Sequence, residues 1–345
     1  MEKPEILKKF LDNGLQLDFE SLDFFSHKPN QINTFLQKVP SVGKPTTVTI
    51  NFINEILQQP ESDVEILKVP EKSRATIDID EFAALVNTRY IFLKKLLAGR
   101  VDLVNLISIN KITPKVKKFS VIIIVKEKMD GENSIVGEDE TGEHTFFFKK
   151  KADFEQVFLD DVIGIVCESD ERIKIEKMFW PDLPLRREVT RTEEDLELTV
   201  SNYPLARAAD GKEIAITTEG HKAKINADVF DMPVMVKVKQ SAVVLISNSK
   251  YLKKYQQREK NEEELIASLL KRRNLSPVIE ADHAAFSNDP FLIDMVPDIF
   301  IIFDVQGSGS FNYKGTTVLM MPEREKEKTS WRINLKTRET KRIEN

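Results

Sequence analysis

Hydrophobic residues recur at helical spacing through the first 58 residues. The first apolar stripe is Ile6, Leu7, Phe10 and Leu11. Asn13-Gly14 supplies a stop after this stripe, and Asp18 is placed to cap the next helix. We predict a small helical module at 1–58, without a catalytic constellation and suited to docking. Residues 59–79 contain two prolines and no sustained period, which indicates a linker.

The pattern then changes from one long helix to a series of strands. The helix is expected to be capped by Asp80 and ended by Gly99, with its apolar face formed by Phe82, Leu85, Val86, Leu93, Leu96 and Leu97. The expected strands are Asp102–Ser108, Phe119–Val125, Asn133–Gly137, Glu143–Phe148, Val162–Cys167 and Arg172–Phe179, with a short helix around Phe154. We interpret these strands, interrupted by one short helix, as the layout of an OB-fold, in which three strands, one helix and two strands form a five-stranded Greek-key barrel. Residues 80–187 are therefore assigned as a helix plus an OB-fold.

Residues 188–345 also carry the pattern of a folded unit. Ala242–Ile246 and Ile299–Phe303 are continuous apolar runs typical of buried strands. Glu262–Arg273 has helical spacing, with Leu265, Ile266, Leu269 and Leu270 inward. The chain as a whole is expected to be an α+β multidomain protein.

Composition restricts the partners that this chain attracts. Its 345 residues are 41% hydrophobic and 31% charged, and the net charge is −5. No global positive field would draw the protein to nucleic acid or acidic lipid, so any DNA contact is expected to be local or supplied by a partner. The single cysteine, Cys167, lies in an apolar run and is interpreted as a buried structural thiol. No membrane span and no signal pattern are recognised, so a cytoplasmic location without membrane contact is expected.

The predicted barrel is itself acidic, with 14 basic and 17 acidic residues between 101 and 187. OB-folds that bind single strands use a basic groove with stacking aromatic side chains. The one basic cluster beside aromatic residues is Lys149, Lys150 and Lys151, directly after Phe146, Phe147 and Phe148. We keep these three lysines as weak candidates for nucleic-acid binding, although a solvated strand end is the favoured interpretation.

A stiff corner separates the barrel from the C-terminal part. Its sequence is Phe179-Trp180-Pro181-Asp182-Leu183-Pro184-Leu185-Arg186-Arg187. Two prolines force the chain to leave the barrel extended and to turn. Taken alone, the segment is best interpreted as an inter-domain corner packed by its two aromatic residues. It is also our candidate partner-binding surface, formed by Phe179, Trp180, Leu183, Arg186 and Arg187.

Three motifs in one order resemble a known family. They are Glu138-Asp139-Glu140-Thr141-Gly142, the corner from Phe179 to Arg187, and Met295-Val296-Pro297-Asp298-Ile299-Phe300. Their order resembles the small (B) subunit of archaeal family-D DNA polymerase, over nearly the whole chain. The resemblance implies an N-terminal helical module, an OB-fold and, at 188–345, a calcineurin-like phosphoesterase domain. In that family this last domain is a two-metal 3′–5′ exonuclease, which needs Asp, His and Asn ligands.

The ligand motifs of that family are degraded here. Asn202 and Pro204 stand where Asp-x-His is expected, and His221 is the remnant of a Gly-Asn-His motif. Asn248 stands at the later histidine position, and Asp304 and Gln306 lie at the closing Gly-His-x-His. With nearly every ligand replaced, we expect no metal, no cofactor and no catalytic residue in this domain.

The resemblance and the lost ligands together predict a non-catalytic scaffold. The leading hypothesis is an accessory small subunit that supports DNA replication by binding the large catalytic subunit of a DNA polymerase, and that meets DNA within the complex. A second hypothesis is a stand-alone OB-fold protein that binds single-stranded nucleic acid. A third is a residual metal-dependent exonuclease around His221 and Asp304.

Overall fold

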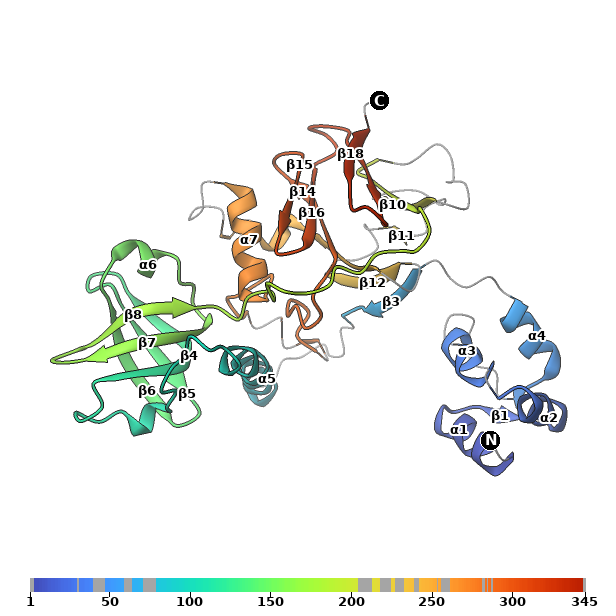
Figure 1. Cartoon of the computed structure of the whole chain (residues 1–345), viewed down its shortest axis with the longest axis horizontal. Helices are drawn as coiled ribbons and strands as arrows, with labels where there is room; N and C mark the ends of the chain where they lie inside the picture. The colour runs from blue at the N-terminus through green and yellow to red at the C-terminus, as the bar shows by residue number, and fades with distance from the viewer. Residues whose placement is uncertain are drawn as a thin grey trace. The chain divides into compact units, whose positions relative to one another are not determined.

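The computed structural model describes residues 3–29, 31–39, 47–58, 64–70, 79–203, 213–217, 225–226, 233–238, 242–252, 254–255, 261–280, 283, 285–286 and 288–343. The chain divides into two compact units, Met1–Ser62 and Asp63–Asn345. The first is mainly helical, and the second combines helices with a closed barrel and two further sheets, so the fold is mixed α/β (Figure 1).

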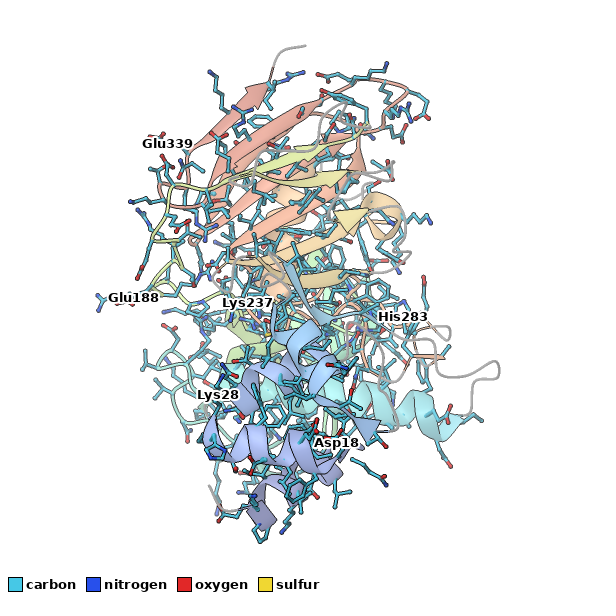
Figure 2. All side chains as sticks on the ribbon, turned by 90° about the vertical axis from the view of Figure 1, so that its right-hand side faces the viewer. Asp18, Lys28, Glu188, Lys237, His283 and Glu339 are labelled. Carbon is cyan, nitrogen blue, oxygen red and sulfur yellow. The ribbon has the colours of Figure 1, made fainter. Side chains whose placement is uncertain are left out.

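The first unit is the helical module that the apolar stripes predict. Its elements are α1 (Lys3–Asp12), β1 (Gln16–Leu17), α2 (Phe19–His27), α3 (Gln31–Lys38), β2 (Thr47–Val48) and α4 (Ile50–Gln58). The Asp18 side chain accepts a hydrogen bond from the Ser21 backbone N–H at 2.8 Å, so the predicted cap of α2 is confirmed. Figure 2 labels Asp18 and Lys28, which flank this helix.

Three phenylalanines form the centre of this unit. Phe10, Phe25 and Phe35 are completely buried. The ring centroid of Phe25 lies 4.9 Å from that of Phe10 and 5.3 Å from that of Phe35, which are favourable separations for aromatic pairs. The module therefore has a hydrophobic core of its own.

In the second unit, α5 precedes a closed barrel of five strands. The elements are α5 (Ile79–Ala98), the 3₁₀ helix η2 (Ile109–Lys111), β4 (Lys118–Met129), β5 (Ser134–Asp139), β6 (Gly142–Phe148), α6 (Lys151–Glu155), β7 (Val162–Ser169) and β8 (Ile173–Phe179). The strands close in the order β4-β5-β6-β8-β7. Strand β4 pairs with both β5 and β7, and the predicted hairpin between β5 and β6 is confirmed by the pairing of Asp139 with Gly142.

The expected strand Asp102–Ser108 is wrong. This segment is a loop with one isolated bridge, between Leu106 and Ser120. Asn105 has a φ of +53°, which interrupts an extended conformation. Leu103 turns inward over Gly164, where an added Cβ would lie 2.6 Å from a Leu103 methyl carbon, while Val104 is 71% exposed. The barrel therefore begins at β4.

Two facing sheets make up the rest of the second unit. Their elements, with the intervening helices, are β3 (Val64–Lys68), β9 (Glu197–Ser201), β10 (Glu213–Thr217), β11 (Ile225–Asn226), β12 (Val234–Val238), β13 (Ala242–Asn248), η4 (Ser249–Tyr251), α7 (Glu262–Arg272), β14 (Ile299–Val305), β15 (Gly309–Tyr313), β16 (Thr316–Pro322), β17 (Ser330–Asn334) and β18 (Thr340–Ile343). One sheet has the order β11-β10-β9-β17-β18, and the other has the order β15-β16-β14-β13-β12-β3.

Strand β14 is buried on both faces, as its continuous apolar run predicts. Ile299, Ile301 and Phe303 belong to the core that the two sheets share. Phe300 and Ile302 belong to the core formed with α7 on the opposite face. Adjacent residues of a strand point to opposite faces, so an uninterrupted apolar run is required where helix and sheet cover both sides.

The expected linker at 59–79 contains a strand that the sequence analysis missed. Val64–Lys68 forms β3, which pairs antiparallel with β12 at the edge of the six-stranded sheet (Figure 1). A short edge strand gains its stability from this pairing and not from a local pattern. The sandwich is therefore not built from 188–345 alone, and the barrel lies within the chain segment that separates β3 from the other sandwich strands.

The first prediction concerns the separate core of the helical module. Replacing buried Phe25 by alanine should destabilise the module by about 3–5 kcal/mol, because the substitution leaves a cavity among three aromatic rings. Circular dichroism and hydrogen exchange of the full chain should show the loss in 3–58, while β4–β8 keep their protection.

Phe19 provides a matched control in the same helix. Its side chain is 78% exposed, so Phe19→Ala should leave the exchange rates of the module nearly unchanged. Equal effects of the two substitutions would contradict the proposed core.

Candidate functional site

Four of the positions that the resemblance compares with metal ligands lie at strand ends of the sandwich. Strands β13, β14 and β16 are parallel neighbours, and Asn248 stands opposite Phe303 in their register. Asp304 follows Phe303, and Gln306 comes directly after β14. Asn202 follows β9 and donates a hydrogen bond to the carbonyl oxygen of Pro322, the last residue of β16. These positions therefore lie at the carboxyl ends of strands, where open α/β sheets commonly bind ligands.

The side chain of Asn202 forms three hydrogen bonds with the backbone of a neighbouring segment. Its amide nitrogen donates to the carbonyl oxygens of Pro322 at 2.8 Å and Glu327 at 2.7 Å. Its amide oxygen accepts from the backbone N–H of Thr329 at 2.8 Å. The side chain is 2% exposed. Because all three bonds hold the loop between β16 and β17, Asn202 acts as a structural clamp.

The other strand-end positions also make local contacts. The Asn248 side chain accepts from the Lys250 backbone N–H at 3.1 Å and so caps η4. The Ser249 hydroxyl donates to the Asp304 carbonyl oxygen at 2.5 Å. The Gln306 backbone N–H donates to the Glu262 carboxylate at 2.9 Å. These bonds tie the strand ends to each other and to the start of α7.

Two of the predicted vestigial positions, Pro204 and His221, lie outside the described residues. Within the described part of the chain, no three His, Cys, Asp or Glu side chains are grouped so that they could hold a metal ion. The amides at Asn202 and Asn248 have neutral oxygen ligands to offer, and the Asn202 oxygen is already bonded to an N–H group.

The corner after β8 is packed inside the chain. Trp180 is 4% exposed and Leu183 is 2% exposed. Arg187 donates to the Asp298 carboxylate at 3.2 Å and to the Pro297 carbonyl at 2.7 Å. This corrects the expectation that Trp180, Leu183 and Arg187 form a partner-binding surface, since their contacts lie between parts of this same chain. The alternative interpretation, an inter-domain corner packed by aromatic residues, describes these side chains.

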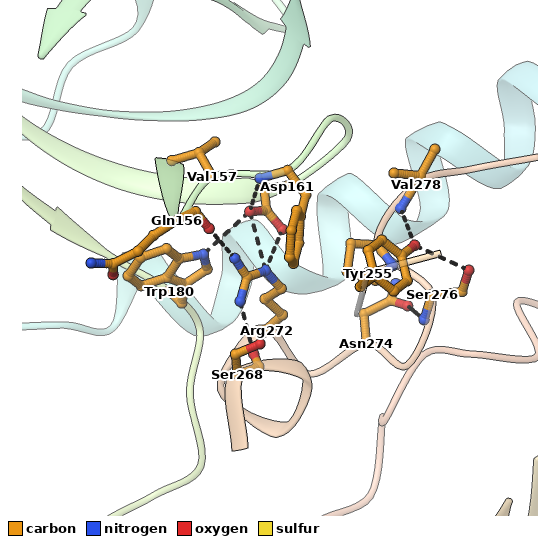
Figure 3. Close-up of polar contacts among 12 residues, drawn as sticks. Gln156, Val157, Asp161, Trp180, Tyr255, Ser268, Arg272, Asn274, Ser276 and Val278 are labelled. Carbon is orange, nitrogen blue, oxygen red and sulfur yellow. Dashed lines mark hydrogen bonds and ion pairs between the residues drawn. The ribbon is translucent and has the colours of Figure 1, made fainter. Parts of the chain in front are cut away.

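A buried ion pair joins the barrel to the sandwich at this corner (Figure 3). Arg272, the last residue of α7, donates from Nε to the two Asp161 carboxylate oxygens at 2.9 and 3.2 Å. Both side chains are at most 4% exposed. Asp161 lies directly before β7 and also accepts from the Phe158 backbone N–H at 2.9 Å. The guanidinium carbon of Arg272 lies 4.2 Å from the Phe158 ring centroid, so ionic, hydrogen-bonding and aromatic contacts converge on one arginine.

A second buried pair attaches α5 to the segment after α7. Arg89 is completely buried and donates from Nε to Asp289 at 2.5 Å. It also donates to the carbonyl oxygens of Ser276 at 3.2 Å and Pro277 at 2.8 Å. Tyr255 accepts from the Val278 backbone N–H at 3.1 Å, and burial raises the pKa of Tyr255 to about 12 (Figure 3). The tyrosine is thus a neutral part of this contact at physiological pH.

The sequence analysis missed these pairs, although part of the signal was present. Arg89 lies four residues after Leu85 and four before Leu93, both on the buried face of α5. A cation on an apolar stripe is a sign of a buried partner. The sequence around Asp289 and Asp161 does not indicate that either is buried in an ion pair. Their partners are far away in the sequence, and only the fold brings them together.

Two of the three lysines after β6 form ion pairs within the chain. Lys149 forms an ion pair with Glu176, and this hydrogen bond raises the pKa of Lys149. Lys151 lies 3.5 Å from Glu155 on α6. Phe146 and Phe148 are buried, while Phe147 lies under the guanidinium of Arg172 at 4.7 Å. Only Lys150 of the three has no ion-pair partner in the described part of the chain, so the cluster offers little unmatched charge.

Comparison of the sequence with models of known families and with curated proteins gives no match. Among the described residues, no helix is both long and apolar enough to cross a lipid bilayer.

The second prediction tests the clamp at Asn202. Asn202→Asp replaces the donating amide by a carboxylate facing two carbonyl oxygens, and we expect a loss of about 2–4 kcal/mol in the free energy of unfolding, since buried donors and acceptors become mismatched. Chemical denaturation with and without manganese measures the loss, and manganese should not restore stability.

Asn248→Asp is the matched control. An aspartate can still accept the Lys250 N–H bond, so this variant should keep wild-type stability within about 0.5 kcal/mol. Recovery of Asn202→Asp by manganese would show that the strand ends form a metal site.

The third prediction concerns the ion pair at the corner. Arg272→Met leaves the Asp161 carboxylate buried without its cation and should cost about 3–5 kcal/mol. Lys271→Met, one residue earlier in α7, should cost far less, because the Lys271 ammonium has no ion-pair partner in the described structure. Adding Asp161→Asn to Arg272→Met should recover a large part of the loss; a fully additive double mutant would contradict direct coupling.

Proposed function

We propose that this chain is a non-catalytic small subunit of a family-D-type replicative DNA polymerase, which supports DNA replication by binding the catalytic large subunit. The order of the three motifs suggests this family. The proposal includes the finer assignment of the barrel as an OB-fold and of the sandwich as a degenerate calcineurin-like domain.

The strand order of the barrel supports the OB-fold assignment. Numbered from β4, the barrel runs 1-2-3-5-4, and its only helix in the described residues, α6, connects the third strand to the fourth. This agrees with the Greek-key arrangement of five strands that defines the fold.

The two facing sheets support the assignment of the sandwich. Three parallel strands, β13, β14 and β16, lie at the centre of the six-stranded sheet. Four of the positions that the resemblance assigns to lost ligands, Asn202, Asn248, Asp304 and Gln306, lie at or just after the carboxyl ends of β9, β13 and β14. This is the location where a sandwich of this kind would hold its metals.

The observation that carries a non-catalytic function is the bonding of Asn202. In an active relative this position would supply a ligand, whereas here an amide donates to two backbone carbonyls and accepts one N–H. A side chain so engaged stabilises the sandwich instead of coordinating a cation. The retained core and the buried ion pairs at the corner are the properties expected of a rigid scaffold.

The fourth prediction is a stable complex between the full chain and a family-D polymerase large subunit when the two are co-expressed. Pro184, Leu185 and Arg186 are the exposed residues of the corner, and Leu185 is 80% exposed. The double substitution Leu185→Asp with Arg186→Glu should reduce co-purification at least about tenfold if this exposed part of the corner contacts the large subunit, as loss of an apolar and a charged contact is worth at least about 1.4 kcal/mol.

Lys328→Glu supplies the control, because Lys328 is exposed on the loop after β16, and it should leave the yield of complex unchanged. The purified chain alone should show no manganese-dependent nuclease activity on single-stranded DNA. Failure to co-purify with the large subunit, or nuclease activity that His221→Ala abolishes, would contradict the proposal.

A further inference from the structure

One edge of strand β8 is unpaired over its last four residues. Strand β8 pairs with β7 up to Phe179, but its pairing with β6 is limited to Lys174 and Ile175. From Glu176 to Phe179, no strand in the described part of the chain pairs with that edge. The backbone N–H and C=O groups of an open edge can pair with another extended segment.

A groove of about 370 Å³ runs beside this edge. Its lining includes Asp153 of α6, Gln156 directly after that helix, and Lys271 of α7. Its apolar lining consists mainly of the partly exposed Met178 and Phe179, since Phe148 and Ile175 are only 9% and 5% exposed. The groove therefore has the combination that a strand-adding peptide needs, an open edge together with apolar surface for alternate side chains.

The unmatched charge in the groove is mainly positive. The Lys271 ammonium lies 4.0 Å from the centroid of the Trp180 ring. Among the described residues it forms no ion pair, and the carboxylate that acts on it electrostatically, Asp182, is already paired with Lys314. Burial lowers the pKa of Lys271, so its charged form is disfavoured where it stands. Lys177 is exposed and likewise has no ion pair in the described structure, whereas Glu176 is neutralised by Lys149. A carboxylate brought to Lys271 would relieve the cost of a partly buried, unpaired cation.

We propose that the Glu176–Phe179 edge of β8 is a docking site for an extended acidic segment of a partner protein, which adds as a strand and brings a carboxylate to Lys271. The proposal goes beyond the polymerase assignment and does not depend on the identity of the partner. A nucleic acid fits less well, because Trp180 is only 4% exposed and cannot stack on a base.

The fifth prediction uses a defined probe and the full chain. A fluorescein-labelled peptide (Val-Glu)₄, which alternates apolar and acidic side chains, should bind with a dissociation constant below the millimolar range in fluorescence anisotropy. The basic peptide (Val-Lys)₄ should bind at least tenfold more weakly. Lys271→Met should weaken binding of (Val-Glu)₄ at least tenfold, whereas the matched exposed variant Lys328→Met should bind as the wild type does.

A second measurement changes the probe and leaves the protein intact. N-methylation of alternate backbone nitrogens in (Val-Glu)₄ keeps its charge and side chains but removes strand pairing along one edge, so binding should fall at least tenfold with one of the two alternate methylation patterns. The backbone amides of Glu176–Phe179 should exchange more slowly when the unmodified peptide is bound.

Each contrary result overturns the proposal. Absence of binding at millimolar peptide, equal binding to Lys271→Met, or equal binding of both N-methylated peptides would exclude docking at this edge. Displacement of the peptide by a single-stranded oligonucleotide that binds more tightly would assign the groove to nucleic acid. None of these results affects co-purification with the polymerase large subunit, which the fourth prediction tests separately.

Discussion

The buried pair between Asp161 and Arg272 is the contact on which the arrangement of the second unit depends. Asp161 precedes a barrel strand and Arg272 ends the helix that covers the sandwich, so one ion pair joins two parts of the fold. The ion pair favours one arrangement of barrel and sandwich over others, because any arrangement that separates the two side chains leaves a buried charge without its partner. The rings of Phe158 and Trp180 add cation–π contacts to the pair, with centroids 4.2 and 5.2 Å from the Arg272 guanidinium carbon.

Next to that pair, further polar contacts attach the Phe179–Arg187 corner to the sandwich. Asp182 adopts a φ of +61° and accepts from Tyr313 at 3.0 Å and Lys314 at 2.5 Å, while Arg187 meets Asp298. The backbone N–H of Asp182 also donates to the Lys271 carbonyl at 2.8 Å. Each bond crosses between segments that are distant in the sequence. The barrel and the sandwich are thereby held in register, which suits a protein whose proposed role is to support another chain.

The polar side chains at the strand ends of the sandwich serve the fold. The parallel strands end together, and these side chains cap a helix and hold a loop. Asn202 is the clearest example, since its three hydrogen bonds order a loop that would otherwise be free. Stability and catalysis place different demands on the same position: a clamp needs saturated hydrogen bonds, whereas a ligand needs an unoccupied oxygen or nitrogen.

The sequence by itself determined the local elements. Apolar spacing predicted α2 with its Asp18 cap, the inward face of α7, and the doubly buried strands β13 and β14, because these depend on short-range geometry and on the burial of continuous runs. Only the tertiary structure decided that 102–108 is a loop, that Val64–Lys68 is a strand, and that Leu183 and Arg187 make their contacts within the chain. Those outcomes depend on partners far along the chain, such as β12 for β3 and Arg272 for the corner, and residue spacing within one segment carries no information about them.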